Sequence, residues 1–306
     1  MKIKKQFFGY FVYRKNASIG QIQSDFQTFL QEAEIAKSRI ILLGNLLFFL
    51  IASLLVFILF TITASASWLL IFFSIVFLVI FVIIYTLLFK GECISQARLE
   101  VLPKILSFLQ RDLNQKNVKV YLDLNANRTR KIKTIPHPRK SGFMRDFFKD
   151  PWLKLSGCFL DDTEFNLQVT EFTICDHGMK YNARGKGKYK SRLKSKGVEL
   201  ELFLSIPRKK YGAVEILQQD AIDAIQLPSN FSLKKLSIKQ NNIKVKVKSQ
   251  PFNILVAQFH QFYTFDYQRP EDAQRTAEDL EQAIGALFLG LYQILNLARE
   301  LSKPVT

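Results

Sequence analysis

The segment between Arg39 and Lys90 constrains this chain most, because it holds 50 consecutive residues without a charge, 41 of them hydrophobic. A transmembrane helix needs about 20 apolar residues, so the segment is long enough for two such helices and too long for one. A soluble globular interior does not require so long an uncharged run. The sequence therefore predicts an integral membrane protein rather than a purely soluble one.

Small and hydroxyl residues at 63–67 interrupt the apolar run, and Trp68 follows with an aromatic ring typical of membrane interfaces. This break predicts a transmembrane hairpin over residues 40–89, with spans at about 40–62 and 68–89. The connecting loop is uncharged, whereas basic residues flank the outer ends of the hairpin: Lys37, Arg39, Lys90 and Arg98. By the positive-inside rule, we expect two spans with the N- and C-termini in the cytoplasm.

Residues 1–39 form the first of three predicted regions, a basic arm followed by an amphipathic helix. Basic and aromatic residues are mixed over residues 1–15, a composition that suits either an interfacial segment or a frayed tail. Apolar residues at helical spacing from Ile22 to Ala33 predict the helix that follows.

Residues 90–306 form the third region, predicted as a cytoplasmic α+β domain. Apolar residues at helical spacing over 95–114 predict a helix that contains Pro103. Alternating patterns predict antiparallel strands at 118–124, 198–206 and 243–248, among others. The predicted fold class is therefore α+β: a two-helix membrane hairpin and a mainly antiparallel β domain flanked by helices.

The last predicted element is a long helix over residues 270–302. Pro270 suits the first turn, and apolar residues recur at spacings of three and four from Ala277 to Leu301. The apolar seam is expected to pack on the sheet or on the helix over 95–115. The alternative is a coiled-coil contact with a protein partner or a second copy of the chain.

Two basic clusters carry most of the positive charge. Residues 128–154 hold nine basic and two acidic groups, and residues 180–196 hold eight basic groups and no acidic one. The second cluster lies between strands, which predicts a long exposed loop. Its basic residues are the candidate site for an anionic surface: Lys180, Arg184, Lys186, Lys188, Lys190, Arg192, Lys194 and Lys196.

Such a cluster suits phosphate groups of lipid or of nucleic acid, or it serves only as a soluble basic loop. Anionic lipid headgroups of the bilayer are the favoured partner. Nucleic acid is disfavoured, because no recognised binding motif accompanies the charge.

No catalytic, cofactor or metal site is predicted. Cys175-Asp-His177 lacks the second ligand pair that structural zinc requires, and Gly185-Lys-Gly-Lys188 lacks the strand-to-helix context of a phosphate loop. The carboxylates of Asp161, Asp162 and Glu164 fit a solvated turn better than a cation site.

The layout resembles a bacterial family of uncharacterised membrane proteins, a domain of unknown function. The matching features are the apolar hairpin, Ser156-Gly157 leading to Val169-Thr-Glu-Phe172, and a basic loop before Lys196-Gly-Val198. A late strand from Ile243 and the closing helix also match. The resemblance implies an N-terminal membrane hairpin and a cytoplasmic α+β domain, and it implies no catalytic residues.

The leading hypothesis is a membrane-anchored, non-enzymatic interaction or scaffold protein. Its basic domain would bind a protein partner or the anionic membrane surface. One alternative is a membrane-bound enzyme whose site is assembled from Asp161, Asp162, Glu164 and His177. Another is an accessory subunit of a membrane transport complex.

Overall fold

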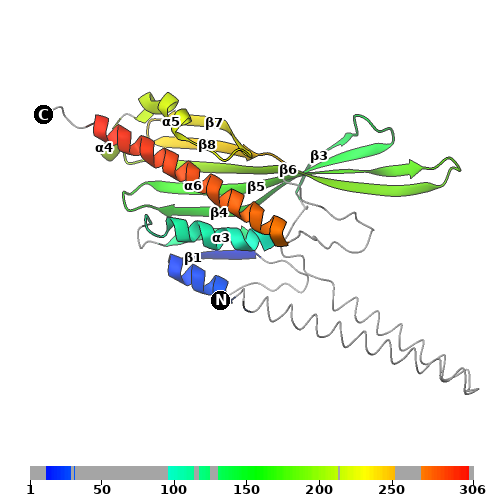
Figure 1. Cartoon of the computed structure of the whole chain (residues 1–306), viewed down its shortest axis with the longest axis horizontal. Coiled ribbons are helices and arrows are strands. Elements are labelled where there is room, and N and C mark those ends of the chain that lie inside the picture. The colour runs from blue at the N-terminus through cyan, green and yellow to red at the C-terminus, as the bar shows by residue number, and fades with distance from the viewer. Residues whose placement is uncertain are drawn as a thin grey trace, which may run out of the picture. The chain divides into compact units, whose positions relative to one another are not determined.

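The fold is described from a computed structural model of the whole chain (Figure 1). The described residues are 12–28, 31, 96–113, 117–124, 130–212, 214–251 and 270–302. The chain divides into two compact units: residues 1–23 together with 92–306, and residues 24–91. The account below concerns the first unit.

An eight-stranded antiparallel sheet is the main element of this unit. Seven strands lie in the order β1-β2-β4-β5-β6-β8-β7, and β3 pairs separately with β4. The strands are β1 (Val12–Ala17), β2 (Val118–Asp123), β3 (Lys131–Pro136), β4 (Phe143–Cys158), β5 (Glu164–Tyr181), β6 (Gly187–Ser205), β7 (Phe231–Lys239) and β8 (Asn242–Ser249).

The described helices are few. They are α3 (Gln96–Leu109), α4 (Arg208–Tyr211), the 3-10 turn η1 (Val214–Leu217), α5 (Gln218–Ala224) and α6 (Pro270–Leu301), with a further helical stretch at 19–28. In Figure 1, α3 and α6 lie across one part of the sheet, which we call the body, and leave the far ends of β4, β5 and β6 uncovered.

The core lies between the body and these helices. Alternate residues of neighbouring strands fall directly opposite one another and point to the covered face, as in the row Leu155, Leu167, Leu202 and Val245. All four are buried. From α6, the ring of Phe288 packs edge-on against Phe159 and Phe165 at 5.8 Å, so the helix is fixed over the sheet by aromatic contacts.

The predicted closing helix is confirmed, and its seam faces the chain's own core. Its residues from Ala277 to Ala298 at spacings of three and four are buried. Only Leu301, at the end of the seam, is exposed. The seam therefore packs within the chain, as the first of the two interpretations predicts.

Arg98, in the first turn of helix α3, joins this helix to strands β4 and β5 of the sheet. Its guanidinium is 4% exposed and binds the Asp150 carboxylate at 2.7 Å and the Glu171 carboxylate at 2.8 Å. These two acidic residues are direct cross-strand neighbours on β4 and β5. Arg98 also donates to the carbonyl of Asp123 and lies over the ring of Trp152. One buried cation thus neutralises two carboxylates that would otherwise repel each other.

The predicted fold class is wrong. The described chain is mainly a large antiparallel sheet with few helices. The strand predicted at 198–206 is only part of β6, which has 19 residues, and β4 and β5 have 16 and 18 residues. The basic segment 180–196, predicted as a loop, is largely strand. Residues 12–17, placed in the predicted basic arm, form an edge strand paired with β2.

The predicted two-span topology is not supported either. The ranges 40–62 and 68–89 lie outside the described residues. Among the described residues, one helical segment, Gln274–Leu301, is long and apolar enough to cross a membrane, and half of it is buried within the fold. The predicted localisation, with two N-terminal spans and both termini in the cytoplasm, is therefore not supported.

Replacing Arg98 with Met tests the contact between α3 and the sheet. The change leaves the Asp150 and Glu171 carboxylates buried together without their cation, which costs about 3–5 kcal/mol of unfolding free energy. Chemical denaturation followed by circular dichroism measures this loss.

The matched control is Lys104→Met on the same helix, whose ion pairs are 3.9 Å long and partly exposed. It should cost less than about 1 kcal/mol. Equal losses in the two variants would contradict the assigned role of Arg98.

Candidate functional site

The distal halves of β4, β5 and β6 form an arm that extends beyond the body of the sheet (Figure 1). Strand β3 pairs with β4 only in this region, whereas β2 pairs with β4 only in the body. We define the arm as residues 130–149 and 173–197. Pairing between β5 and β6 continues along it as far as Tyr181 and Gly187, so the arm ends in a short turn over residues 182–186.

The arm brings together parts of both basic clusters found in the sequence. Its two segments hold fifteen basic and two acidic residues, a net charge of +13 in a chain with a formal net charge of +17. Most of the excess charge of the protein is therefore concentrated on one narrow extension of the sheet.

Strand alternation places most of the candidate site residues on one face of the arm. Along β6, every second residue from Lys188 to Lys196 is basic, and alternate residues point to the same side of a strand. Lys180 on β5 lies directly opposite Lys188. We call this side the cationic face, and it carries Lys180, Lys188, Lys190, Arg192, Lys194 and Lys196. Arg184 and Lys186 lie at the terminal turn and are exposed.

The two acidic residues of the arm are engaged internally. Asp176 is 2% exposed, and Arg145 holds its carboxylate with contacts of 2.6 and 3.1 Å. Lys194 and His137 each lie 3.4 Å from the same carboxylate. Burial opposes ionisation of Asp176, but the hydrogen bonds and charges of Arg145 and Lys194 prevail and lower its pKa to about 2.

Asp146 is the corresponding buried carboxylate on the other face of the arm, and it also binds side chains of neighbouring strands. Thr134 of β3 donates to its carboxylate at 2.6 Å, and His177 of β5 lies 3.1 Å away. Burial would raise the pKa of Asp146, but the Thr134 hydrogen bond and the nearby charges of His177 and Lys131 lower it. Both carboxylates therefore bind the arm's strands together, and of the exposed lysines they contact Lys131 and Lys194. The described ion pairs include none for Lys180, Lys188 or Lys190.

The face opposite the cationic face carries exposed apolar side chains near the tip of the arm. Met179 lies directly across from Tyr189, and Met144 lies across from His177. Tyr181 is 65% exposed. We call Met144, Met179, Tyr181 and Tyr189 the apolar patch. The arm is thus a two-sided ribbon with a cationic and a partly apolar face.

The residues of the alternative enzymatic site are not brought together. Asp161 accepts hydrogen bonds from Thr163 and from the Tyr211 hydroxyl, and Asp162 pairs with Lys210, all at the body end of β5. His177 lies on the arm, thirteen strand residues beyond Glu164, which corresponds to about 43 Å. These four side chains therefore cannot act on one substrate together.

The Cys175-Asp-His177 triplet is divided by strand alternation. Cys175 and His177 point to one face, whereas Asp176 points to the other. Cys175 lies 3.2 Å from the Ser191 hydroxyl, and His177 pairs with Asp146. Within the described part of the chain, no group of three or more His, Cys, Asp or Glu side chains is arranged to hold a metal.

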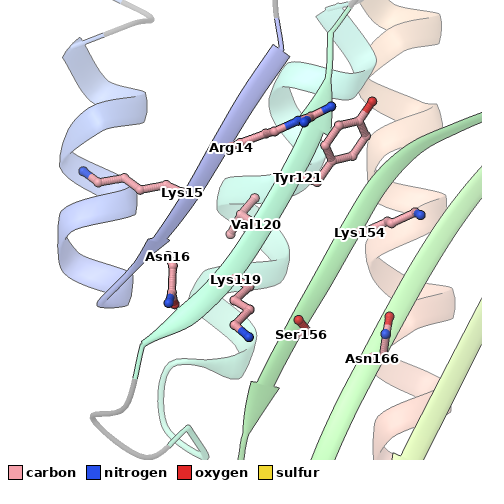
Figure 2. A pocket seen from close by; sticks show the side chains of 9 residues that line it. All are labelled: Arg14, Lys15, Asn16, Lys119, Val120, Tyr121, Lys154, Ser156 and Asn166. Carbon is pink, nitrogen blue, oxygen red and sulfur yellow. The ribbon is translucent and has the colours of Figure 1, made fainter. Parts of the chain in front are cut away.

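A second set of polar residues, which the sequence analysis missed, lies on the uncovered face of the body. They surround a shallow hollow over β1, β2, β4 and β5 (Figure 2): Arg14, Asn16, Lys119, Tyr121, Lys154, Ser156 and Asn166. Lys15 and Val120 also line the hollow, but they alternate with these residues along β1 and β2, and Val120 is buried in the core. The lining residues come from segments up to 150 residues apart, so only the strand register unites them. No local sequence signal marks such a group.

No protein-family model, curated protein or solved structure matches this chain. The resemblance to an uncharacterised bacterial membrane-protein family therefore stays a prediction. The functional argument depends on the geometry of the arm and of the body.

Replacing Asp176 with Asn tests the buried ion pair of the arm. An unfolded Asp titrates near pH 3.9, and the pKa in the folded protein is about 2. A lowered pKa in the folded state stabilises the protein above pH ~4, and this contribution is lost as the pH falls from 4 to 2. The wild type should therefore exceed Asp176→Asn in melting temperature at pH 5, with the difference shrinking towards pH 2. A difference that does not vary over this range would contradict the assignment.

Proposed function

We propose that this chain is a non-enzymatic interaction protein whose arm binds an anionic membrane surface through its cationic face. The proposal concerns the binding partner of the described domain and requires no particular arrangement of residues 40–89.

One observation carries the proposal: like charges face each other on the arm without acidic neighbours. Lys180 and Lys188 are direct cross-strand partners, and directly opposed like charges destabilise an antiparallel pair. Two unit charges 5 Å apart repel by about 0.8 kcal/mol even in water. An anionic partner removes this cost on binding, whereas a purely structural ribbon gains nothing from the arrangement.

The positive charge continues from the arm onto the body on the same side of the sheet. At the junction, the ammonium groups of Lys149 and Lys248 both lie over the ring of Phe172, at 5.9 and 5.8 Å from its centre. Register assigns Phe172 to the side that carries Asp176 and the cationic face. The described helices α3 and α6 cover the opposite side of the body, so among the described elements no helix lies on this charged surface.

A surface of this kind suits a lipid headgroup layer. Each basic residue near an anionic leaflet contributes about 1 kcal/mol, an interaction that requires no specific geometry. Six residues of the cationic face and the two at the turn would therefore give strong but salt-sensitive binding.

A protein partner is the second candidate, and the apolar patch favours it. Exposed Met and Tyr side chains beside Arg and Lys are typical of protein interfaces. Changing Met179 and Tyr189 to Ser would then leave vesicle binding unchanged. A loss of vesicle binding in this variant would instead assign the patch to the bilayer.

The triple variant Lys180→Gln, Lys188→Gln and Lys190→Gln tests the lipid proposal. Flotation of the full-length chain is measured with phosphatidylcholine vesicles and with vesicles that also contain phosphatidylglycerol. Neutral vesicles account for any binding that does not depend on anionic lipid. The variant should lose about 10- to 100-fold in the additional affinity for anionic vesicles, since three residues contribute up to about 3 kcal/mol.

The matched control removes three basic groups from the helical side of the fold. Lys104, Lys209 and Arg275 lie on α3, α4 and α6, and their replacement with Gln changes net charge equally. This control should retain the wild-type preference for anionic vesicles. Equal losses in the two triple variants would show that only net charge matters and would contradict a binding face on the arm.

A further inference from the structure

The hollow on the uncovered face of the body is built from two rows of directly opposed residues. One row runs Asn16, Lys119, Ser156 and Asn166 across four strands, and the next runs Arg14, Tyr121 and Lys154 across three. Figure 2 shows these side chains on the side of the sheet away from the helices. Strand register fixes the order of these residues across the sheet.

The chemistry of the two rows is complementary. Arg14, Lys119 and Lys154 supply three cations, and the lining of the hollow contains no carboxylate. Asn16, Ser156 and Asn166 supply neutral groups that both donate and accept hydrogen bonds. Among the described residues, no ion pair joins Lys119 or Lys154 to an acidic side chain.

The neighbouring region of the same face behaves differently. On β6 and β8, Lys244 and Lys246 contact Glu201 at 2.5 and 3.1 Å. There the cations and carboxylates neutralise each other across strands. Positive charge is therefore left available at the hollow and not uniformly over the open face of the body.

The dimensions suit a small ligand. Opposed residues of adjacent strands have Cβ atoms about 5 Å apart, and successive residues on one face of a strand are about 6.7 Å apart. A ligand that contacts both rows therefore spans about 7 Å. Arg14 lies over the Tyr121 ring at 4.8 Å, which holds its guanidinium at one side of the hollow.

We propose that this hollow binds a small phosphorylated polyol, such as glycerol phosphate, through its cations and the neutral side chains next to them. Lys119, Lys154 and Arg14 contact the phosphate, and Ser156 and Asn166, which are direct neighbours on β4 and β5, contact the hydroxyl groups. The site goes beyond the proposed function of the arm, because no arm residue lines it. The ligand is either free in solution or the headgroup of a phospholipid.

Calorimetric titration of the full-length chain in nonionic detergent tests the site. Glycerol phosphate is compared with glycerol and with inorganic phosphate. It should bind at least 10-fold more tightly than either, because only glycerol phosphate engages both sets of side chains. The variant Lys119→Gln with Lys154→Gln should weaken this binding at least 10-fold. Lys104→Gln with Lys209→Gln on the helical side should not.

A second variant separates hydroxyl recognition from charge. Ser156→Ala with Asn166→Ala should weaken glycerol phosphate binding several-fold and leave inorganic phosphate unchanged. Equal binding of phosphate and glycerol phosphate, with equal losses in the hollow and control variants, would overturn the site by reducing it to unspecific charge attraction.

Phosphatidylglycerol vesicles distinguish a ligand that is free in solution from the headgroup of a phospholipid. Loss of vesicle affinity in the Lys119/Lys154 variant, without measurable binding of soluble glycerol phosphate, supports a lipid headgroup. Wild-type behaviour of this variant in both assays would overturn the proposal. The Lys180/Lys188/Lys190 variant should keep full binding of soluble glycerol phosphate, so a failure of the arm proposal is distinguishable from a failure of this one.

Discussion

The arrangement of the described domain depends on continuous pairing of three long strands. Strands β4, β5 and β6 stay hydrogen-bonded to one another from the helix-covered body to the tip of the arm. In the body, buried leucines on one face supply the stability. None of the described helices covers the arm. Its strands are joined by Asp146, which binds the Thr134 hydroxyl and His177, and by Asp176, which binds Arg145 and Lys194. Pairing thus extends a stable sheet into a region that could not form a core.

The junction between the body and the arm has irregular strand pairing, where the strands leave the helix-covered part of the sheet. Strand β4 has one extra residue between Pro151 and Leu153, and β6 has one extra between Ser195 and Val198, whereas β5 runs through without interruption. Gly197 adopts a φ of +88°, and a side chain there would clash with the carbonyl of Ser249 at 2.6 Å. With Arg98 between Asp150 and Glu171 at the same level, the junction is fixed by packing, charge and backbone conformation together.

Sequence patterns predicted much of the body and little of the arm. The strands at 118–124 and 243–248 and the closing helix were predictable, because their buried faces are filled by apolar residues at a clear period. The arm was missed because the residues that alternate with its basic residues are Tyr, Ser and Leu, a pattern that resembles a polar loop. Strand β1 was missed because it has only six residues, with Arg, Lys and Asn in succession, and its pairing partner lies about 100 residues away.

The apolar residues of β5 change face along the strand, from the covered face at Val169 to the other face at Phe172 and Ile174. The pairing register shifts on both sides of Thr170, and the extra residues lie in the neighbouring strands β4 and β6. Such compensation depends on the partners of a strand, so it cannot be read from the strand alone. The hollow on the body was unpredictable for the same reason, since its two rows exist only through register.

The central claim is that one face of the arm meets an anionic surface. Lysine acetylation of the full-length chain, mapped by mass spectrometry with neutral and with anionic vesicles, tests it most directly. Lys180, Lys188 and Lys190 should lose reactivity only with anionic vesicles, while Lys104 and Lys209 on the helical side should react equally in both. Unchanged reactivity of the three arm lysines, or equal protection of lysines on both sides of the fold, would contradict the claim.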